Sequence, residues 1–245
     1  MQAVIDNHAI YQKQWPNWVG MKKFGPASRW LRWLVEKAIM EVDARSIGSA
    51  LDVGCGEGTL TAHLSHLLPA AQIRGIDFSD TGVRIAIETY GSGKVEFECL
   101  PIQEETGEYD LVSAFEVLEH IEDWKPFLAE MAKRSRRYLL VSFPTGRMRP
   151  FEVHVGHYRN FAKGEMEAAM AELGFAPKTI RYAGFPFYSP LYRDLCQLTN
   201  AGNNSLSTGA FGQGKRLISD LFYLAFRLSS HRQWGDQFCG IFERK

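Results

Sequence analysis

The stretch LDVGCGEGTL (residues 51–60) runs from a short apolar segment into a turn with glycines at positions 54, 56 and 58. Glycine has no Cβ, so a turn of this kind lets a ligand approach the backbone closely. The apolar segment before it is typical of a buried strand, and TLTAHLSHLL (59–68) after it is typical of a helix that ends at Pro69. A ligand is therefore expected at the carboxyl end of the first strand.

The strand–helix alternation continues along the chain and predicts a parallel sheet covered by helices on both faces. Further strands are expected within residues 72–79, 94–101, 109–118 and 137–144, and further helices at 26–42, 81–90, 124–135 and 163–175. Beyond residue 186 the alternation breaks. There the sequence predicts a helix at 189–200, a polar glycine-rich loop at 201–214, a helix at 215–230 and a closing strand at 236–245.

Composition narrows the class of protein and its partners. The 245-residue chain balances 28 Lys and Arg against 28 Asp and Glu, so no overall charge favours nucleic acid or an anionic membrane. Its four cysteines lie far apart, which argues against a zinc site or a disulfide scaffold and fits a reducing compartment. No signal pattern or transmembrane-length apolar run is present, and a cytoplasmic protein is expected.

The glycine turn differs from a nicotinamide-binding fingerprint. In that fingerprint a third small residue would stand at position 59, which is Thr59 here. Asp52 precedes the first glycine, where an acid suits a ligand with an amine and a sulfonium better than a pyrophosphate. Asp77 follows Gly56 by 21 residues, close to the spacing of a carboxylate that binds ribose hydroxyls. These features together predict an adenosine-containing ligand.

At this point the sequence resembles the class I S-adenosylmethionine-dependent methyltransferases. The resemblance rests on LDVGCGEG (51–58), GIDFS (75–79), EYDLVSAFEVLEHIED (108–123) and YLLVSFP (138–144), and covers roughly residues 45–185. The string VLEHI is similar to the branch with ubiquinone-biosynthesis O-methyltransferases, and GHYRNF (156–161) to members associated with glycan or natural-product biosynthesis.

The resemblance implies a Rossmann-like, doubly wound α/β fold whose seven-stranded sheet has an antiparallel last strand. The chain would form one domain over residues 1–245. Within it we expect an N-terminal helical cap (1–45), a cofactor-binding core (46–187), a helical insertion (188–235) and the last strand (236–245).

The same resemblance implies a set of residues for S-adenosylmethionine. It places Gly54, Gly56 and Gly58 along the methionine part, and Phe115 beside the methionine and the transferable methyl. Asp52 would stand near the amino group, Asp77 would bind the ribose, and Phe78 would lie against the adenine. The segment around Pro101 would border the adenine. It lacks the aspartate that relatives often carry there, which leaves Gln103 or a backbone carbonyl to meet the adenine amino group.

Methyl transfer to a hydroxyl requires removal of a proton, and histidine suits that task near neutral pH. His157 is the first candidate for the general base, followed by His154 and by Glu116 at the end of a strand. A purely structural turn at GHYR is an equally supported alternative. No metal is expected, because the H-x-x-H spacing has no third ligand nearby. His120 is expected to order its turn through hydrogen bonds with Glu119.

The expected activity is methyl transfer to a small or medium acceptor, most simply a hydroxyl oxygen in sugar, quinone or natural-product metabolism. A nicotinamide-dependent oxidoreductase and a non-catalytic binding module are the alternatives. The N-terminal aromatics are expected either to cover the cofactor as a lid or to serve as packing; they are Tyr11, Trp15, Trp18 and Phe24. The apolar stripe of helix 215–230 would face the domain, a second subunit of a homodimer, a membrane surface or a lipid-linked acceptor.

Overall fold

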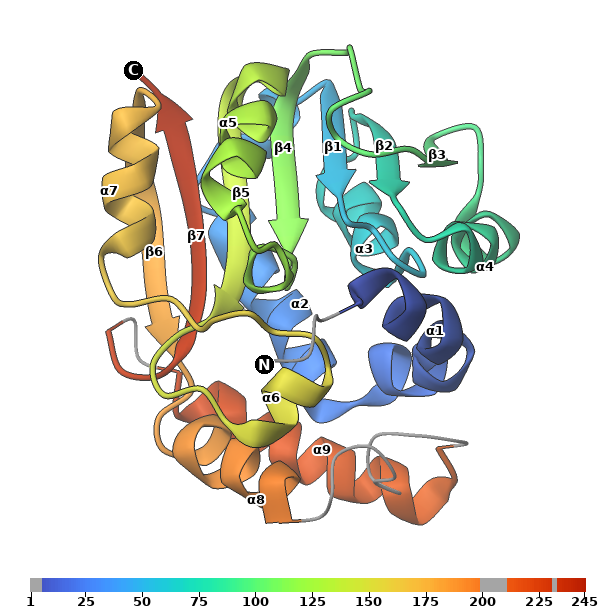
Figure 1. The fold of residues 1–245 in the computed structure, drawn as a ribbon, viewed down its shortest axis with the longest axis vertical. Helices are drawn as coiled ribbons and strands as arrows, with labels where there is room; N and C mark the ends of the chain where they lie inside the picture. The colour runs from blue at the N-terminus through green and yellow to red at the C-terminus, as the bar shows by residue number, and fades with distance from the viewer. Residues whose placement is uncertain (1–5, 199–210, 231–232) are drawn as a thin grey trace.

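One seven-stranded sheet organises the molecule, in the order β3-β2-β1-β4-β5-β7-β6. The computed structural model describes residues 6–198, 211–230 and 233–245. The strands are β1 (Ser49–Val53), β2 (Gln72–Asp77), β3 (Val95–Cys99), β4 (Tyr109–Phe115), β5 (Ser135–Pro144), β6 (Phe175–Ala183) and β7 (Gln237–Arg244). Strands β1 to β5 pair in parallel, and β7 runs antiparallel to both β5 and β6. The predicted fold class, including the antiparallel last strand, is confirmed (Figure 1).

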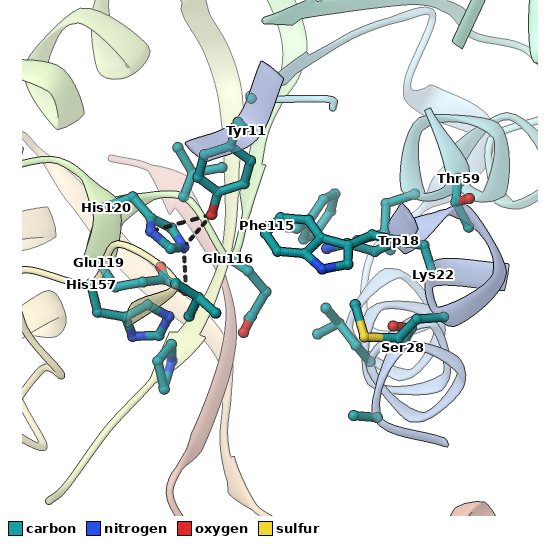
Figure 2. A pocket seen from close by; sticks show the side chains of 18 of the residues that line it. Tyr11, Trp18, Lys22, Ser28, Thr59, Phe115, Glu116, Glu119, His120 and His157 are labelled. Carbon is teal, nitrogen blue, oxygen red and sulfur yellow. Dashed lines mark hydrogen bonds and ion pairs between the residues drawn. The ribbon is translucent and has the colours of Figure 1, made fainter. Parts of the chain in front are cut away.

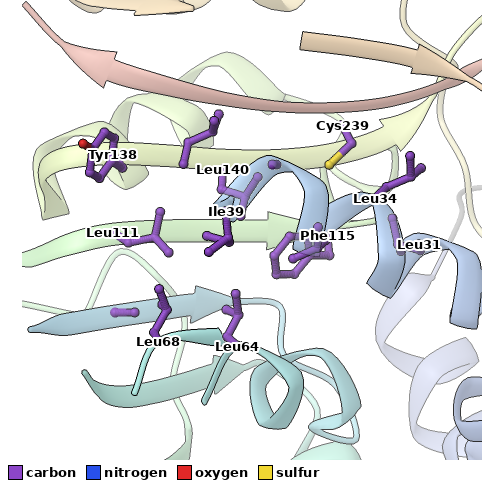
Figure 3. Close-up of a cluster of buried hydrophobic side chains, with 14 of the residues drawn as sticks. Leu31, Leu34, Ile39, Leu64, Leu68, Leu111, Phe115, Tyr138, Leu140 and Cys239 are labelled. Carbon is purple, nitrogen blue, oxygen red and sulfur yellow. The ribbon is translucent and has the colours of Figure 1, made fainter. Parts of the chain in front are cut away.

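Both faces of the sheet are buried, as the alternation of strands and helices in the sequence predicted. Along β5, Tyr138 and Leu140 belong to one core cluster, whereas Leu139 and Val141 belong to the other, because side chains alternate along a strand. Figure 3 shows the first cluster, in which helix side chains such as Leu34 pack over the strands.

Two pairs of helices supply most of the cover. α2 (Pro26–Ile39) and α3 (Thr59–Leu67) contribute to the first cluster, and α5 (Trp124–Arg134) and α7 (Glu165–Glu172) to the second. α2 begins at Pro26, as expected for proline at the first helical position. α7 is followed by Gly174, whose φ of +82° matches a glycine at the end of a helix.

The carboxyl ends of β1, β2 and β4 meet three helices from distant parts of the sequence (Figure 1). These are α1 (Asn7–Phe24), the amino end of α4 (Asp80–Tyr90) and α6 (Pro150–His154). Three short helical turns complete the order, η1 (Ala44–Ser46), η2 (Leu118–His120) and the π-turn η3 (Phe187–Tyr192). Within residues 6–45, where a helical cap was predicted, the structure describes α1, α2 and the short turn η1, and α2 belongs to the core of the sheet.

The segment before the last strand is largely helical, as predicted. It contains η3, α8 (Arg193–Leu198) and α9 (Gln213–Leu228), and α9 begins two residues before the helix expected at 215–230. The loop expected at 201–214 lies mostly outside the described residues, which resume at residue 211. Among the helices that the structure describes, none has the length and apolar character needed to cross a membrane.

Candidate active site

A cavity of about 380 Å³ lies at the carboxyl ends of the central strands. Its walls come from α1, α2, the glycine turn, the end of β4, the α6 region and η3. Parallel strands bring the ends of β1, β2 and β4 to one edge, which is where open α/β sheets bind their ligands. The cavity therefore stands where the glycine turn predicted a site.

The glycine turn is fixed by the end of the neighbouring strand. The N–H groups of Gly54 and Cys55 donate to the carbonyl of Ile76, at 2.8 and 3.0 Å. Asp77 accepts from the N–H of Gly56 through Oδ2 and from the N–H of Ser79 through Oδ1, both at 2.8 Å. Asp77 thus joins the turn after β1 to the turn after β2. Each of its carboxylate oxygens accepts one of these hydrogen bonds and has a lone pair left for another donor.

Trp15 of α1 packs directly on the glycine turn. A Cβ on Gly56 would stand 2.4 Å from Cη2 of Trp15, and a Cβ on Gly82 would stand 2.8 Å from its Nε1. The ring is buried, and its N–H has no hydrogen-bond acceptor among the described residues. Because Gly56 and Gly82 have no side chains, the ring of Trp15 fits between them. Its indole N–H has no hydrogen-bond partner among the described residues.

Asp52 lies inside the sheet at the base of the cavity. Its carboxylate accepts from the hydroxyl of Thr61 at 2.6 Å and from the hydroxyl of Ser113 at 2.9 Å. Burial raises the pKa of Asp52 to about 7, although both hydrogen bonds act in the opposite direction.

The residues implied for the cofactor divide into two groups. Those that line the cavity are Asp52, Gly54, Asp77, Phe78 and Phe115. Gly56, Gly58 and Pro101 are not among its lining residues. At Gly58 a Cβ would meet Ala86 and Phe97, so this glycine permits close packing of helix and strand.

Glu116 follows β4 in a strained backbone conformation. Its φ of +56° makes it the one residue other than glycine with a positive φ in the described part of the chain. Its Oε1 accepts from the hydroxyl of Ser142 at 2.9 Å and from the amide of Gln237 at 2.7 Å. Burial raises the pKa of the Glu116 carboxyl. Figure 2 shows Glu116 between the side that carries His120 and the helix that carries Trp18 and Lys22.

Glu119, His120 and Tyr11 lie together on the other side of the cavity (Figure 2). The Tyr11 hydroxyl lies 2.8 Å from Nε2 of His120. Glu119 is fully buried, and neither of its carboxyl oxygens has a hydrogen-bond partner in the described residues. Burial raises the pKa of Glu119 well above its ordinary value. Burial also lowers the pKa of His120 well below its ordinary value. The expected hydrogen bond between Glu119 and His120 is wrong, since their nearest side-chain atoms are 4.0 Å apart.

His157 lines the cavity and His154 does not. The ring of His157 lies 4.6 Å from that of His120, and its Nδ1 lies 3.4 Å from Oδ1 of Asn160. Burial lowers the pKa of His157 to about 4. His154 is exposed, and its Nδ1 pairs with the carbonyl of Pro150 at 2.8 Å because both belong to the short helix α6. The structure therefore brings the first-ranked histidine into the site and leaves the second outside it.

Glu119, His120 and His157 also offer donor atoms that a cation could use, all within 4.8 Å of one another. The expectation of no metal considered only the H-x-x-H pair and missed this spatial cluster. Glu119 and His120 come from the turn after β4, whereas His157 comes from the loop after α6, 37 residues further along the chain. The spacing of these three residues in the sequence does not predict that they lie together.

Three features of the site were not assigned from the sequence. Glu119 and His120 were visible in the string EVLEH, yet were interpreted as a structural turn. Lys22 lines the cavity on the α1 side, with Nζ 5.6 Å from the ring centre of Trp15. Arg193 is buried against Glu152, to which its Nε donates at 2.9 Å, and both residues line the cavity.

The chain is similar to known methyltransferases in sequence and in fold. Residues 51–137 match a family described as a methyltransferase domain. The chain is 32% identical over 132 residues to the ubiquinone biosynthesis O-methyltransferase of Bordetella avium, with 50% of this chain and 52% of that protein covered. It is 32% identical over 96 residues to the mitochondrial ubiquinone biosynthesis O-methyltransferase of Saccharomyces cerevisiae, with 37% and 31% covered. The chain thus spans about half or less of the length of these relatives.

Among solved structures, the magnesium protoporphyrin IX methyltransferase of Synechocystis PCC 6803 with bound SAM shares the fold. The TM-score is 0.59 at 16% identity, and the match covers 100% of both chains. A putative methyltransferase of Haloferax volcanii, in complex with the activator Trm112, has a TM-score of 0.64 at 13% identity, covering 99% and 97% of the two chains.

Proposed function

We propose that this chain, whose residues 51–137 match a methyltransferase domain, is a class I S-adenosylmethionine-dependent methyltransferase that transfers a methyl group to a hydroxyl oxygen of a small or medium acceptor. The observation that carries the proposal is the Glu119 carboxyl. It is fully buried and without a hydrogen-bond partner in the described chain, in the same cavity as Asp77 and the glycine turn. A buried carboxyl without a partner is costly unless a ligand supplies one.

The residues around the glycine turn fit the proposed cofactor. The partnerless N–H of Trp15 offers a donor, and Asp77 has lone pairs left for ribose hydroxyls. Phe78 lines the cavity beside Asp77 and offers a face for adenine. Carboxylates such as Asp52 and Glu116 suit a cationic sulfonium and ammonium, while Lys22 is the cation placed to meet the carboxylate of the methionine part.

When bound, S-adenosylmethionine supplies an electrophilic methyl group on a sulfonium. The protein contributes mainly by holding the acceptor oxygen in line with that methyl group and by excluding water. Phe115 closes the end of β4 next to Glu116, and α1 covers the cavity with Trp15 and Trp18. The predicted lid function of the N-terminal aromatics remains part of this proposal.

The acceptor must lose a proton, and Glu119 is placed to take it. Bound S-adenosylmethionine would supply the methyl group and keep the electron pair of the broken carbon–sulfur bond on sulfur, while Glu119 would accept the proton of the acceptor hydroxyl. A general base works best when its pKa lies near the working pH. The pKa of His157, at about 4, makes it a weak base, whereas burial raises that of Glu119. His157 is therefore assigned to holding the acceptor oxygen, together with His120.

The distal wall of the cavity favours an acceptor with an apolar or aromatic body. Tyr188 and Tyr192 of η3 and Phe151 of α6 line it, with Arg193 beneath them. Among sugar, quinone and natural-product acceptors, this lining fits a phenolic or quinone-type molecule better than an unsubstituted sugar. The many hydroxyls of a sugar would need polar partners.

Calorimetric titration with S-adenosylmethionine and S-adenosylhomocysteine tests the proposal. We expect micromolar binding that Asp77→Ala abolishes and Asp80→Ala, three residues on and exposed, leaves intact. Labelled methyl transfer to phenolic acceptors would then distinguish an enzyme from a binding module. Absence of binding by folded protein, or binding of NADH in its place, would overturn the proposal.

A further inference from the structure

α9 (Gln213–Leu228) is apolar on two opposite sides, and the described residues of the chain cover only one of them. Its inner side carries Phe222 and Phe226, which pack against Tyr192 and Trp30 with ring centres 5.4 and 5.6 Å apart. Its outer side carries four exposed leucines, Leu217, Leu221, Leu224 and Leu228, of which Leu221 is 62% and Leu228 74% exposed. An exposed apolar stripe on a helix normally faces a partner, so the outer side of α9 calls for one.

The outer leucines have the spacing of a helix–helix seam. Successive members are four, three and four residues apart, which is the alternation of the a and d positions of a heptad. Ile218, also exposed, lies beside the stripe. Such a stripe is a contiguous apolar patch of about several hundred Å², the size that marks an interaction site on a protein surface.

The charges beside the stripe make it complementary to itself. Asp220 and Arg227 are seven residues apart and so occupy the same heptad position along one flank of the leucines. In an antiparallel pairing that sets Leu221 opposite Leu224 of a second copy, Leu217 falls opposite Leu228. Asp220 then comes to the same level as Arg227 across the seam. A single two-fold axis therefore pairs the leucines of the two copies with one another and sets Asp220 of each copy beside Arg227 of the other.

We propose that α9 is a homodimerisation helix, which pairs antiparallel with α9 of a second copy of this chain across a two-fold axis. Asp220 also pairs with Arg29 of its own chain, yet its side chain stays 57% exposed and can face a second cation. Arg216, Asp220 and Arg227 stand on this flank, so an acid lies beside the stripe, where an anionic lipid surface would repel it and a second copy would set Arg227 opposite it. A pair of helices of this length buries on the order of 1,000 Å² in total, at the lower limit of specific interfaces. The dimer is accordingly expected to be reversible, with a micromolar Kd.

The pairing would also support the acceptor side of the cavity. Phe226 packs on Tyr188 and Tyr192, with ring centres 5.5 and 5.2 Å apart, and both tyrosines line the cavity. A second copy on the outer side of α9 restrains the helix that backs this wall. The dimer itself is argued from the helix alone and does not depend on the proposed reaction.

Sedimentation velocity of the full chain, over a concentration series from about 1 to 200 µM, tests the proposal. We expect a monomer–dimer equilibrium that Leu221→Glu weakens by roughly tenfold or more, the loss typical of an apolar anchor at the centre of an interface. Ile87→Glu is the matched control, because Ile87 is 51% exposed on α4, away from the stripe. Leu228→Lys, at the end of the helix, is the second variant should Leu221→Glu fail to fold.

Charge exchange tests the orientation of the pair. Arg227→Asp should weaken the dimer, because it sets a second carboxylate opposite Asp220 across the seam, and the double variant Asp220→Arg with Arg227→Asp should recover it. Wild-type protein that stays monomeric at about 200 µM, well above the micromolar Kd expected here, would overturn the proposal. A monomer that binds vesicles of phosphatidylcholine and phosphatidylglycerol through the leucines would overturn it as well. A dimer unaffected by Leu221→Glu and Leu228→Lys would place the interface elsewhere and equally overturn it.

Discussion

The hydroxyl of Tyr11 lies 2.8 Å from Nε2 of His120, and this contact joins the amino-terminal helix to the turn after the fourth strand. Asn7, one turn earlier on α1, donates through Nδ2 to the carbonyl of His120 at 2.8 Å and to that of Gly156 at 3.1 Å. Two residues of one helix therefore fasten it over the side of the cavity that carries His120.

Replacing Tyr11 by Phe should loosen this attachment. The loss of one buried hydrogen bond costs about 1 kcal/mol of the docking free energy of α1. We expect faster amide exchange over residues 7–24 and a several-fold lower rate of methyl transfer. Tyr90→Phe is the matched control, because its hydroxyl pairs with Thr59 at 3.2 Å and Tyr90 does not line the cavity. Equal exchange in the two variants would show that the Tyr11–His120 contact does not hold α1.

Glu119→Gln should reduce methyl transfer by roughly 10²- to 10⁴-fold, the contribution of a positioned general base. In the wild-type enzyme the rate should rise with pH through the raised pKa of Glu119, because only the deprotonated carboxylate accepts a proton. His157, whose pKa is about 4, stays neutral over that range. Glu122→Gln, an exposed neighbour, should keep the wild-type pH profile. A Glu119→Gln enzyme with the wild-type profile would exclude Glu119 as the base.

Gly56→Ala should destabilise the fold more than Gly164→Ala does. Both glycines have positive φ, +52° and +87°, so both substitutions carry about 1 kcal/mol of backbone strain. Only at Gly56 does the added Cβ also collide with Trp15, for a further cost of about 1–3 kcal/mol; nothing lies within 4 Å of a Cβ at Gly164. Denaturant unfolding measures the difference. If the collision is its cause, the cost of Gly56→Ala should shrink in a Trp15→Ala background.

Asp52→Asn should raise the stability of the fold at pH 8 by about 2–4 kcal/mol and change it little near pH 4. The pKa of Asp52 is about 7 in the folded protein, against an ordinary 3.8. The folded state therefore holds a proton that the unfolded state releases between these values, and its stability falls as pH rises through this window. Unfolding in denaturant at the two pH values measures this. An equal effect of the substitution at both pH values would contradict the assigned pKa.

Chelation tests whether the Glu119, His120 and His157 cluster works without a cation. The proposed reaction uses Glu119 as a proton acceptor, so we expect the same rate before and after dialysis against EDTA. Metal analysis of the dialysed protein accompanies the assay. A rate that falls on chelation and returns with added Mg²⁺ or Zn²⁺ would instead assign these three residues to a cation.

The sequence was informative wherever one segment carried a complete signal. Hydrophobic runs, Pro26 and Gly174 located strands and helix ends, and the glycine turn with Asp77 located the ligand edge. The sequence was uninformative where the site joins distant segments. Tyr11 and His120 are 109 residues apart, and the indole over Gly56 comes from a helix 41 residues earlier in the chain. The sequence offered no means of distinguishing His154 from His157. His154 is the last residue of α6 and its ring is exposed, whereas His157 follows the helix and its ring is buried.

The position of α1 also bears on the kinetics of turnover. Through Trp15 the helix covers the glycine turn, and through Tyr11 it covers the side where the acceptor is proposed to bind. One helix thus covers both parts of the cavity, so under the proposed function the cofactor and the acceptor would both leave past α1. Release of either product would then require the same movement of α1, and the rate of that movement, rather than the methyl transfer itself, would limit the number of turnovers per second.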